Sequence, residues 1–419
     1  MRIGGGRAGW EGAVAGLVLL AAVLTGCGLG GDDYPDGTTT ASQTELQAEV
    51  RQLLKERVRA VRRGDEAAFL DRLVDDPLLR RDQRDYFANL AQLPLARFGY
   101  ALGEDAVTSA PGRITAQVDI VMELDGFDDA PVRTPTRMTF VREQDGVLRI
   151  VAARDEEYER ERHAVPQPWD TVPVQIRQGS GVLGVFDRDS WRHADEIVDE
   201  VEQGIAEVSA ELPDAWSRHV VVYALSDTSF LARLPDLPGG DPEQLDGVAF
   251  PVPIRPRADE YAGTRFLLHP RILERSPVMR SRLIRHELVH VALGRTDDRV
   301  PTWLSEGLAE YVSVRPLAPQ ERLISRDAVA AARNGLTGLP ADATFNGQQS
   351  SANYGIAWYA CEYIASVYGE AALWRLFDDM RADGGVSDAD QDTVLVRVLG
   401  VDAATLARAT GARILSVFG

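Results

Sequence analysis

Hydrophobic positions in residues 43–161 show two different patterns, one typical of helices and one typical of strands. Apolar residues recur every three or four positions from Leu46 to Val61, which predicts an amphipathic helix. Arg-Gly-Asp at 63–65 interrupts this pattern, and a second helix is expected to begin near Ala67. Extended runs then occupy 113–124, 136–143 and 147–154, and Gln-Asp-Gly at 144–146 predicts a hairpin between the last two. Helices followed by antiparallel strands predict an α+β domain over residues 43–161.

Residues 170–419 predict a second domain with a small sheet followed mainly by helices. A strand-like run opens it at 172–186, and a helix at about 190–211 leads to short strands at 219–225 and 264–270. The last of these strands is either an edge strand for an extended peptide or a plain core strand. Residues 226–260 are rich in proline, glycine and aspartate, which indicates a long irregular loop that could line a cleft. Prolines at 166 and 168 predict a linker without helix over 162–169.

The N-terminus carries a targeting pattern that is not expected to join the fold. Arg2 and Arg7 precede an apolar run at 13–24 that is short for a membrane span, which predicts a signal peptide over 1–26. The segment LTGC ending at Cys27 resembles the bacterial lipobox; a plain secretory signal with an unrelated cysteine is the alternative. The resemblance implies a lipoprotein anchored through Cys27 at the outer face of the cytoplasmic membrane. The polar residues 27–42 predict a flexible tether.

Charge and cysteine content narrow the possible partners. The chain has 419 residues and a net charge of −19, which disfavours binding to nucleic acid. Its only other cysteine is Cys361, so lipidation of Cys27 would leave no internal disulfide. Cys361 is expected to be a small buried apolar residue. The oligomeric state is left open.

The segment HELVH at 286–290 is the main candidate for chemistry. Ser276 as N-cap, Pro277 at the first helical position and Gly294 at the C-terminal end predict a helix around it. His286 and His290 are four residues apart, so their rings lie on one helix face and can bind one zinc ion. Glu287 projects near the same face and can accept a proton from zinc-bound water. The alternative is a chance arrangement on an ordinary helix.

The segment PTWLSEGLAEY at 301–311 offers a third ligand. Glu306 follows His290 by sixteen residues, on a short helix that Thr302 can cap. Glu310 lies one turn beyond Glu306, where it can accept the second ring N–H of a ligand histidine. Together with the apolar character of the HELVH helix, which makes unpartnered polar groups there costly, these residues favour a metal site.

HELVH followed by WLSEGLAEY resembles the gluzincin metallopeptidases, most closely the compact peptidase MA-like group. The resemblance extends loosely over residues 170–419. It implies a zincin-like domain in which His286, His290 and Glu306 hold one zinc ion per chain and Glu287 is the general base. Related enzymes place a tyrosine where Tyr354 lies, which makes Tyr354 a candidate to stabilise the oxyanion. Tyr311 and Tyr368 are competitors, and a packing role for Tyr354 is the alternative.

The N-terminal region resembles, more weakly, the cone of the nuclear transport factor two or SnoaL-like group. VRAVRRGDEAAFLDRLVD and the following strands carry this resemblance, and an accessory domain is the simpler interpretation. The whole sequence thus predicts a zinc-dependent hydrolase of peptides or proteins, exported and anchored to a membrane. A catalytically inactive zincin-like lipoprotein that serves binding or envelope assembly is the alternative function.

Overall fold

The N-terminal region is built from three helices packed against a four-stranded antiparallel sheet. The computed structural model describes residues 43–227, 229–234, 243, 245–383 and 387–419, so the predicted signal peptide, the tether and Cys27 lie outside the described residues. The sheet runs in the order β1-β2-β3-β4. The elements are α1 (Gln43–Arg63), α2 (Glu66–Leu70), α3 (Pro77–Gln92), β1 (Leu95–Ala110), β2 (Arg113–Leu124), β3 (Val132–Arg142) and β4 (Leu148–Ala152).

Most of these elements follow from the sequence pattern. The apolar positions of α1 are buried up to Leu54, whereas Val58 and Val61 are partly buried, and α1 packs against β1. The predicted hairpin joins β3 and β4 through Gly146, which has a φ of 77° that favours glycine. Two elements were not predicted, α3 and the long strand β1. Helix α3 has a clear start, because Pro77 follows Asp76 and the Asp76 side chain accepts hydrogen bonds from the amides of Leu78 and Leu79.

The second sheet has five strands in the order β5-β6-β7-β9-β8, and β8 is the edge strand that pairs antiparallel with β9. Of the two alternatives for the strand at 264–270, the plain core strand is confirmed and the edge strand is wrong, because β9 pairs with β7 on one side and with β8 on the other. Residues 226–260 are not one irregular loop either, since they contain β8. The prolines of β8 concealed it in the sequence, yet an edge strand tolerates proline. The strands are β5 (Gln175–Gly179), β6 (Val182–Phe186), β7 (Val220–Ala224), β8 (Gly247–Pro253) and β9 (Tyr261–Leu268).

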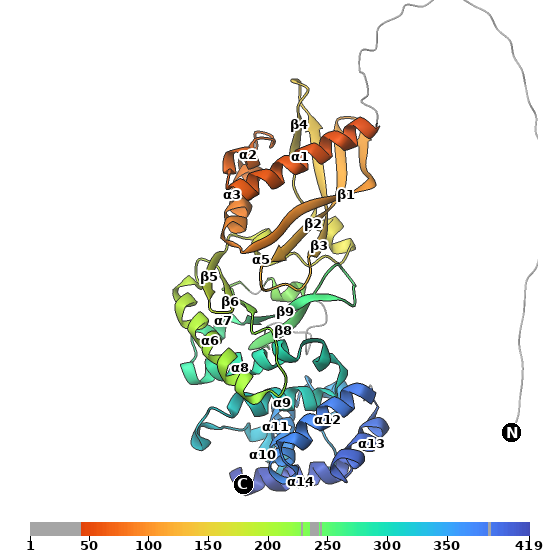
Figure 1. Ribbon diagram of the computed structural model, residues 1–419. Coiled ribbons are helices and arrows are strands. Elements are labelled where there is room, and N and C mark those ends of the chain that lie inside the picture. Colours follow the sequence, from red (N-terminus) through yellow and green to blue (C-terminus); the bar gives the residue numbers. More distant parts are fainter. Residues whose placement is uncertain (1–42, 228, 235–242, 244, 384–386) are drawn as a thin grey trace, which may run out of the picture. The chain divides into compact units, whose positions relative to one another are not determined.

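Helices cover one face of this sheet. Its inward side chains share a core with α6 and α8, and with the helices that follow them. Figure 1 shows α9 and the later helices gathered in one group next to α8. This confirms the α+β class with a helical C-terminal part. The helices are α6 (Ala194–Glu211), α7 (Pro270–Leu273), α8 (Pro277–Leu293), α9 (Thr302–Val314), α10 (Arg326–Asn334), α11 (Ser350–Tyr368), α12 (Glu370–Asp383), α13 (Asp388–Leu399) and α14 (Ala403–Phe418).

The opposite face of the five-stranded sheet is buried as well. Its side chains, such as Val221 and Leu267, share a hydrophobic core with the N-terminal helices and sheet. Residues Ser42–Gly419 form one compact unit, and a domain boundary at 162–169 stays a prediction. The predicted absence of helix from 162–169 is wrong: α4 (Glu156–Glu161) precedes this segment and α5 (Pro168–Thr171) begins in it. Pro168 occupies the first turn of α5, where a missing N–H is harmless.

Arg265 of β9 lies at the centre of a buried polar network on this second face. Its guanidinium contacts Asp128 at 2.6 Å, and both side chains are at most 3% exposed. The same group donates hydrogen bonds to Gln167 at 2.9 Å and to the hydroxyl of Tyr223 at 2.8 Å. The network therefore links β9 to residues that precede the five-stranded sheet.

Replacing Arg265 by methionine is expected to destabilise the protein by about 3–5 kcal/mol, because the Asp128 carboxylate would remain buried without a partner. Chemical denaturation followed by circular dichroism measures this free energy of unfolding. Arg177→Met is the matched control: its partner Asp195 is 82% exposed, so the loss should be about 0–1 kcal/mol. Equal stability losses in the two variants would contradict a structural role for the buried pair.

Candidate metal centre

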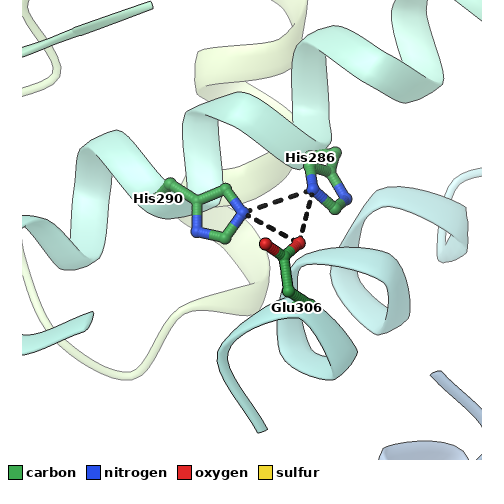
Figure 2. A group of neighbouring side chains, drawn as sticks. All are labelled: His286, His290 and Glu306. Atoms are coloured by element: carbon green, nitrogen blue, oxygen red, sulfur yellow. Dashed lines mark hydrogen bonds and ion pairs between the residues drawn. The ribbon is translucent and has the colours of Figure 1, made fainter. Parts of the chain in front are cut away.

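Three potential ligand atoms converge where α8 and α9 meet. The Nε2 atoms of His286 and His290 are 3.2 Å apart, as expected for histidines one helical turn apart. Oε2 of Glu306, on α9, lies 3.2 Å from the first nitrogen and 3.5 Å from the second. Figure 2 shows the three side chains pointing toward one another from the two helices. This group could hold a metal ion.

The size of this triangle matches tetrahedral coordination. Ligand bonds of about 2.0–2.1 Å to a tetrahedral ion separate the ligand atoms by about 3.3–3.4 Å. The observed separations of 3.2, 3.2 and 3.5 Å lie around this value. Three ligands of such a polyhedron leave its fourth position free for a water molecule or a substrate atom.

Each histidine also places its other ring nitrogen beside a carboxylate. Nδ1 of His290 lies 2.6 Å from Oδ2 of Asp297, and Nδ1 of His286 lies 3.4 Å from Oε1 of Glu310. Glu310 is held from its other side by Arg282. A carboxylate that accepts the Nδ1–H orients the ring and leaves Nε2 as a lone-pair donor. The contact between His290 and Asp297 is a hydrogen bond, whereas Nδ1 of His286 makes no hydrogen bond and Glu310 approaches it only as an ion-pair partner. With both rings in this tautomer, two lone pairs and the Glu306 carboxylate would face one another.

Two nitrogen lone pairs and a carboxylate that face one another repel each other unless a positive charge lies between them. Oε2 of Glu306 is buried and makes no hydrogen bond. Burial lowers the pKa of His286, but its contacts with Glu306 and Glu310 outweigh burial and raise the pKa to about 9. A proton or a metal ion satisfies this demand electrostatically. A metal ion fits the tetrahedral separations and the carboxylates near the two Nδ1 atoms. It would also give the unpaired Oε2 atom of Glu306 a partner.

Glu287 lies between the metal site and strand β8. A Cβ atom placed on Gly247 would come within 2.8 Å of Oε1 of Glu287, so only glycine leaves room for this carboxylate. The backbone amide of Ala249 hydrogen-bonds the same carboxylate. Burial raises the pKa of Glu287, while His286 and His290 oppose that rise. The Glu287 carboxylate of α8 is thus held against the edge strand β8, and its pKa is higher than that of an exposed glutamate.

The ligands and Glu287 line a cavity of about 290 Å³. Strand β8 forms one wall through Gly247, Val248, Ala249 and Pro251, none of which carries a long side chain. Tyr354 lines the cavity too, with its ring centroid 6.1 Å from that of His286 and its hydroxyl 3.3 Å from Oδ1 of Asn346. The structure therefore places Tyr354 beside the predicted ligands.

The two competing tyrosines are not among the residues that line this cavity. The hydroxyl of Tyr311 donates a hydrogen bond to Glu370 at 2.8 Å. Tyr368 ends α11 and packs against Tyr363. Neither tyrosine is placed to contact a substrate at the metal site.

Helix α9 is pressed closely against α11. A Cβ on Gly307 would lie 2.6 Å from the backbone oxygen of Ala357 and 2.8 Å from the buried sulfur of Cys361. The glycine after Glu306 in WLSEGLAEY is therefore required by packing. Cys361 is fully buried, as predicted, and burial raises the pKa of its thiol.

Sequence reasoning missed Asp297 and strand β8. Asp297 lies in the short 3₁₀ helix Gly294–Arg299 that follows α8, seven residues after His290. Its position between the two ligand-bearing segments was a usable signal, since a carboxylate at the Nδ1 atom is common for ligand histidines. Thr302 is the first residue of α9, and Pro301 is at the N-cap position that the sequence suggested for Thr302.

Replacing Asp297 by asparagine is expected to weaken metal binding by about 10–100-fold, because His290 would lose the carboxylate that orients it. Competition with a coloured chelator measures this affinity. The exposed Asp214 provides a matched control, and Asp214→Asn should bind metal as the native chain does. An unchanged affinity in the Asp297 variant would remove Asp297 from the site.

Comparison with known proteins adds no family: no protein-family model matches the chain, and no curated protein matches it.

Proposed function

We propose that the protein is a zinc-dependent hydrolase that cleaves peptide bonds. The observation that carries the proposal is the tetrahedrally spaced His286, His290 and Glu306 triangle with the Glu287 carboxylate beside it in one cavity. Two histidines, one glutamate and one free position are a ligand set that zinc uses for catalysis rather than structure. The resemblance of HELVH and WLSEGLAEY to the gluzincin metallopeptidases supports the same assignment.

Zinc in this site would supply Lewis-acid chemistry, acidifying a water molecule and polarising the carbonyl of the bond to be cut. Glu287 takes a proton from the attacking water and later delivers it to the leaving amine. The raised pKa of Glu287 suits both steps, because the group must accept and then release a proton. Tyr354 donates a hydrogen bond to the oxygen that becomes negative in the transition state.

Strand β8 provides a template for an extended substrate. It lies at the edge of its sheet, beside the ligands, and its short side chains leave space along the cavity wall. A peptide can therefore pair with its free edge, although Pro251 and Pro253 limit the number of backbone donors. Among the described residues that line the cavity there is no arginine or lysine. This lining favours cleavage within a chain over capture of a terminal carboxylate.

The protein is further proposed to act outside the cytoplasm, held to a membrane by lipid on Cys27. The LTGC segment supports this location. Within the part of the chain that the structure covers, no helix is long and apolar enough to cross a membrane. Attachment through a lipid at the end of the tether would place the hydrolase at the membrane surface.

Replacing Gly247 by alanine is expected to lower peptide turnover by at least about 10-fold without loss of metal. The new methyl group would push the Glu287 carboxylate away from the metal, and small displacements of a catalytic group have large effects on rate. Turnover and metal content measured on the same preparation test this. Gly338→Ala is the control, because a Cβ atom placed there would meet nothing within 4 Å. Full activity of the Gly247 variant would contradict the fixed position of Glu287.

The proposal as a whole is tested by metal analysis combined with digestion of a peptide library. We expect about one zinc ion per chain, and cleavage that a chelator stops and added zinc restores. A protein that binds zinc but cleaves no peptide would instead support the non-catalytic alternative, a binding or envelope-assembly module. A protein without stoichiometric metal would contradict both functions.

A further inference from the structure

A groove of about 490 Å³ lies between α1 and the first strands of the four-stranded sheet, away from the metal site. Its lining contains five basic residues and no acidic one. Four of them lie on α1 and one on β1: Arg51, Lys55, Arg59, Arg62 and Arg97. In a chain with a net charge of −19, such a one-sided group of cations is unexpected.

The four cations of α1 form a row along its exposed face. They are spaced three or four residues apart, so they project from one side of the helix over about 16 Å. All four are exposed, and none of them makes an ion pair in the described part of the chain. Arg97 differs, because Glu123 lies 3.8 Å from it. The row therefore keeps positive charge that the protein itself does not neutralise.

The floor of the groove is apolar. Leu54 and Val121 are buried in it, and Phe98 and Leu102 extend it along β1. Arginines above an apolar floor suit a ligand with a negatively charged head and a hydrophobic portion. Guanidinium groups pair with phosphate through two parallel hydrogen bonds, which makes a phosphate head the best match.

We propose that this groove docks the protein on a membrane surface by binding the phosphate headgroups of anionic phospholipids. The proposal rests on the membrane anchoring proposed for Cys27. Only fifteen residues lie between Cys27 and the start of α1, and a tether of the flexible kind that the sequence predicts spans about 19–23 Å on average at that length. The anchor would therefore hold the basic row close to the headgroups.

Sedimentation with vesicles tests the docking. The mature chain from residue 27 onward, with Cys27→Ser so that no lipid is attached, is mixed with vesicles of phosphatidylcholine alone or with added phosphatidylglycerol. We expect binding only to the anionic vesicles, and weaker binding at high salt. Each basic side chain near an anionic surface strengthens binding about fivefold, so changing the four α1 cations to glutamine should weaken it by at least about 100-fold.

A matched variant controls for net charge. Arg326, Arg333, Arg375 and Arg413 are exposed on the C-terminal helices, and changing all four to glutamine alters the net charge equally. This variant should bind anionic vesicles as the native chain does. Equal loss in both variants, or equal binding to neutral vesicles, would overturn the proposal. Displacement by millimolar inorganic phosphate would overturn it too, in favour of a free phosphate ligand.

Separate readouts distinguish this inference from the proposed function. The groove variant should hold its zinc and cleave a soluble peptide at the native rate, because the groove lies outside the catalytic cavity. Vesicle binding lost with activity intact supports docking. Mass spectrometry of Cys27 in the native protein tests the anchor itself, and an unmodified Cys27 would contradict anchoring while leaving the hydrolase assignment untouched.

Discussion

Replacing Glu287 by glutamine is expected to reduce peptide hydrolysis by about 10²–10⁴-fold while one zinc ion per chain stays bound. The amide keeps the volume of the side chain and can still accept the hydrogen bond from the amide of Ala249. It cannot take a proton from water. The three ligand atoms are unchanged, so zinc affinity should remain. Initial rates on a peptide found in the library digest, together with zinc analysis of the same sample, measure the effect.

Glu104→Gln provides the matched control for this variant, because Glu104 is an exposed residue of β1 outside the metal cavity. Its rate should equal that of the native chain. Retained turnover in the Glu287 variant would exclude Glu287 as the base. Loss of zinc together with turnover would assign Glu287 a role in holding the metal centre instead.

Replacing His286 by alanine is expected to abolish stoichiometric zinc binding and hydrolysis together. Loss of an outer partner of a ligand costs about 10–100-fold in metal affinity, so loss of the ligand itself should cost more than about 100-fold. Zinc content after dialysis and the rate on the same peptide are the measurements. Because His286 is only 7% exposed, its replacement could disturb the packing around α8. A circular dichroism spectrum checks that the variant is folded.

His219→Ala controls for the loss of a histidine as such, because His219 is exposed and lies outside the metal cavity. It should keep both zinc and activity. Full zinc occupancy in the His286 variant would be incompatible with the proposed ligand set.

Local sequence patterns predicted much of this fold and the three residues that converge in the candidate site. The apolar spacing of α1 and α6, the hairpin at Gly146 and the ends of α8 all depend on neighbouring residues, and all are present in the structure. His286 and His290 are placed together by the helix itself. Glu306 joins them because the connection between α8 and α9 is short and both helices bury apolar faces in the same core.

The features that were missed depend on contacts between distant segments. Strand β8 contains two prolines and was predicted as loop, yet its partner β9 supplies the pairing that orders it. Asp297 contacts His290 only because of the direction in which the chain leaves α8. Arg265 sits in a strand whose sequence suggests an apolar interior, and its partner Asp128 is 137 residues away. No local pattern indicates such a pair.

The close approach of α9 and α11 at Gly307 would tie the proposed zinc ion to the lifetime of the protein. In the proposed zinc protein, α9 carries Glu306 on one side and meets α11 without a side chain between them on the other. Metal that binds the native state but not the unfolded chain stabilises the docking of these helices. Starvation for zinc would then do more than stop hydrolysis, because it would open the helical part to neighbouring proteases. Zinc supply would thus set the abundance of the protein as well as its activity.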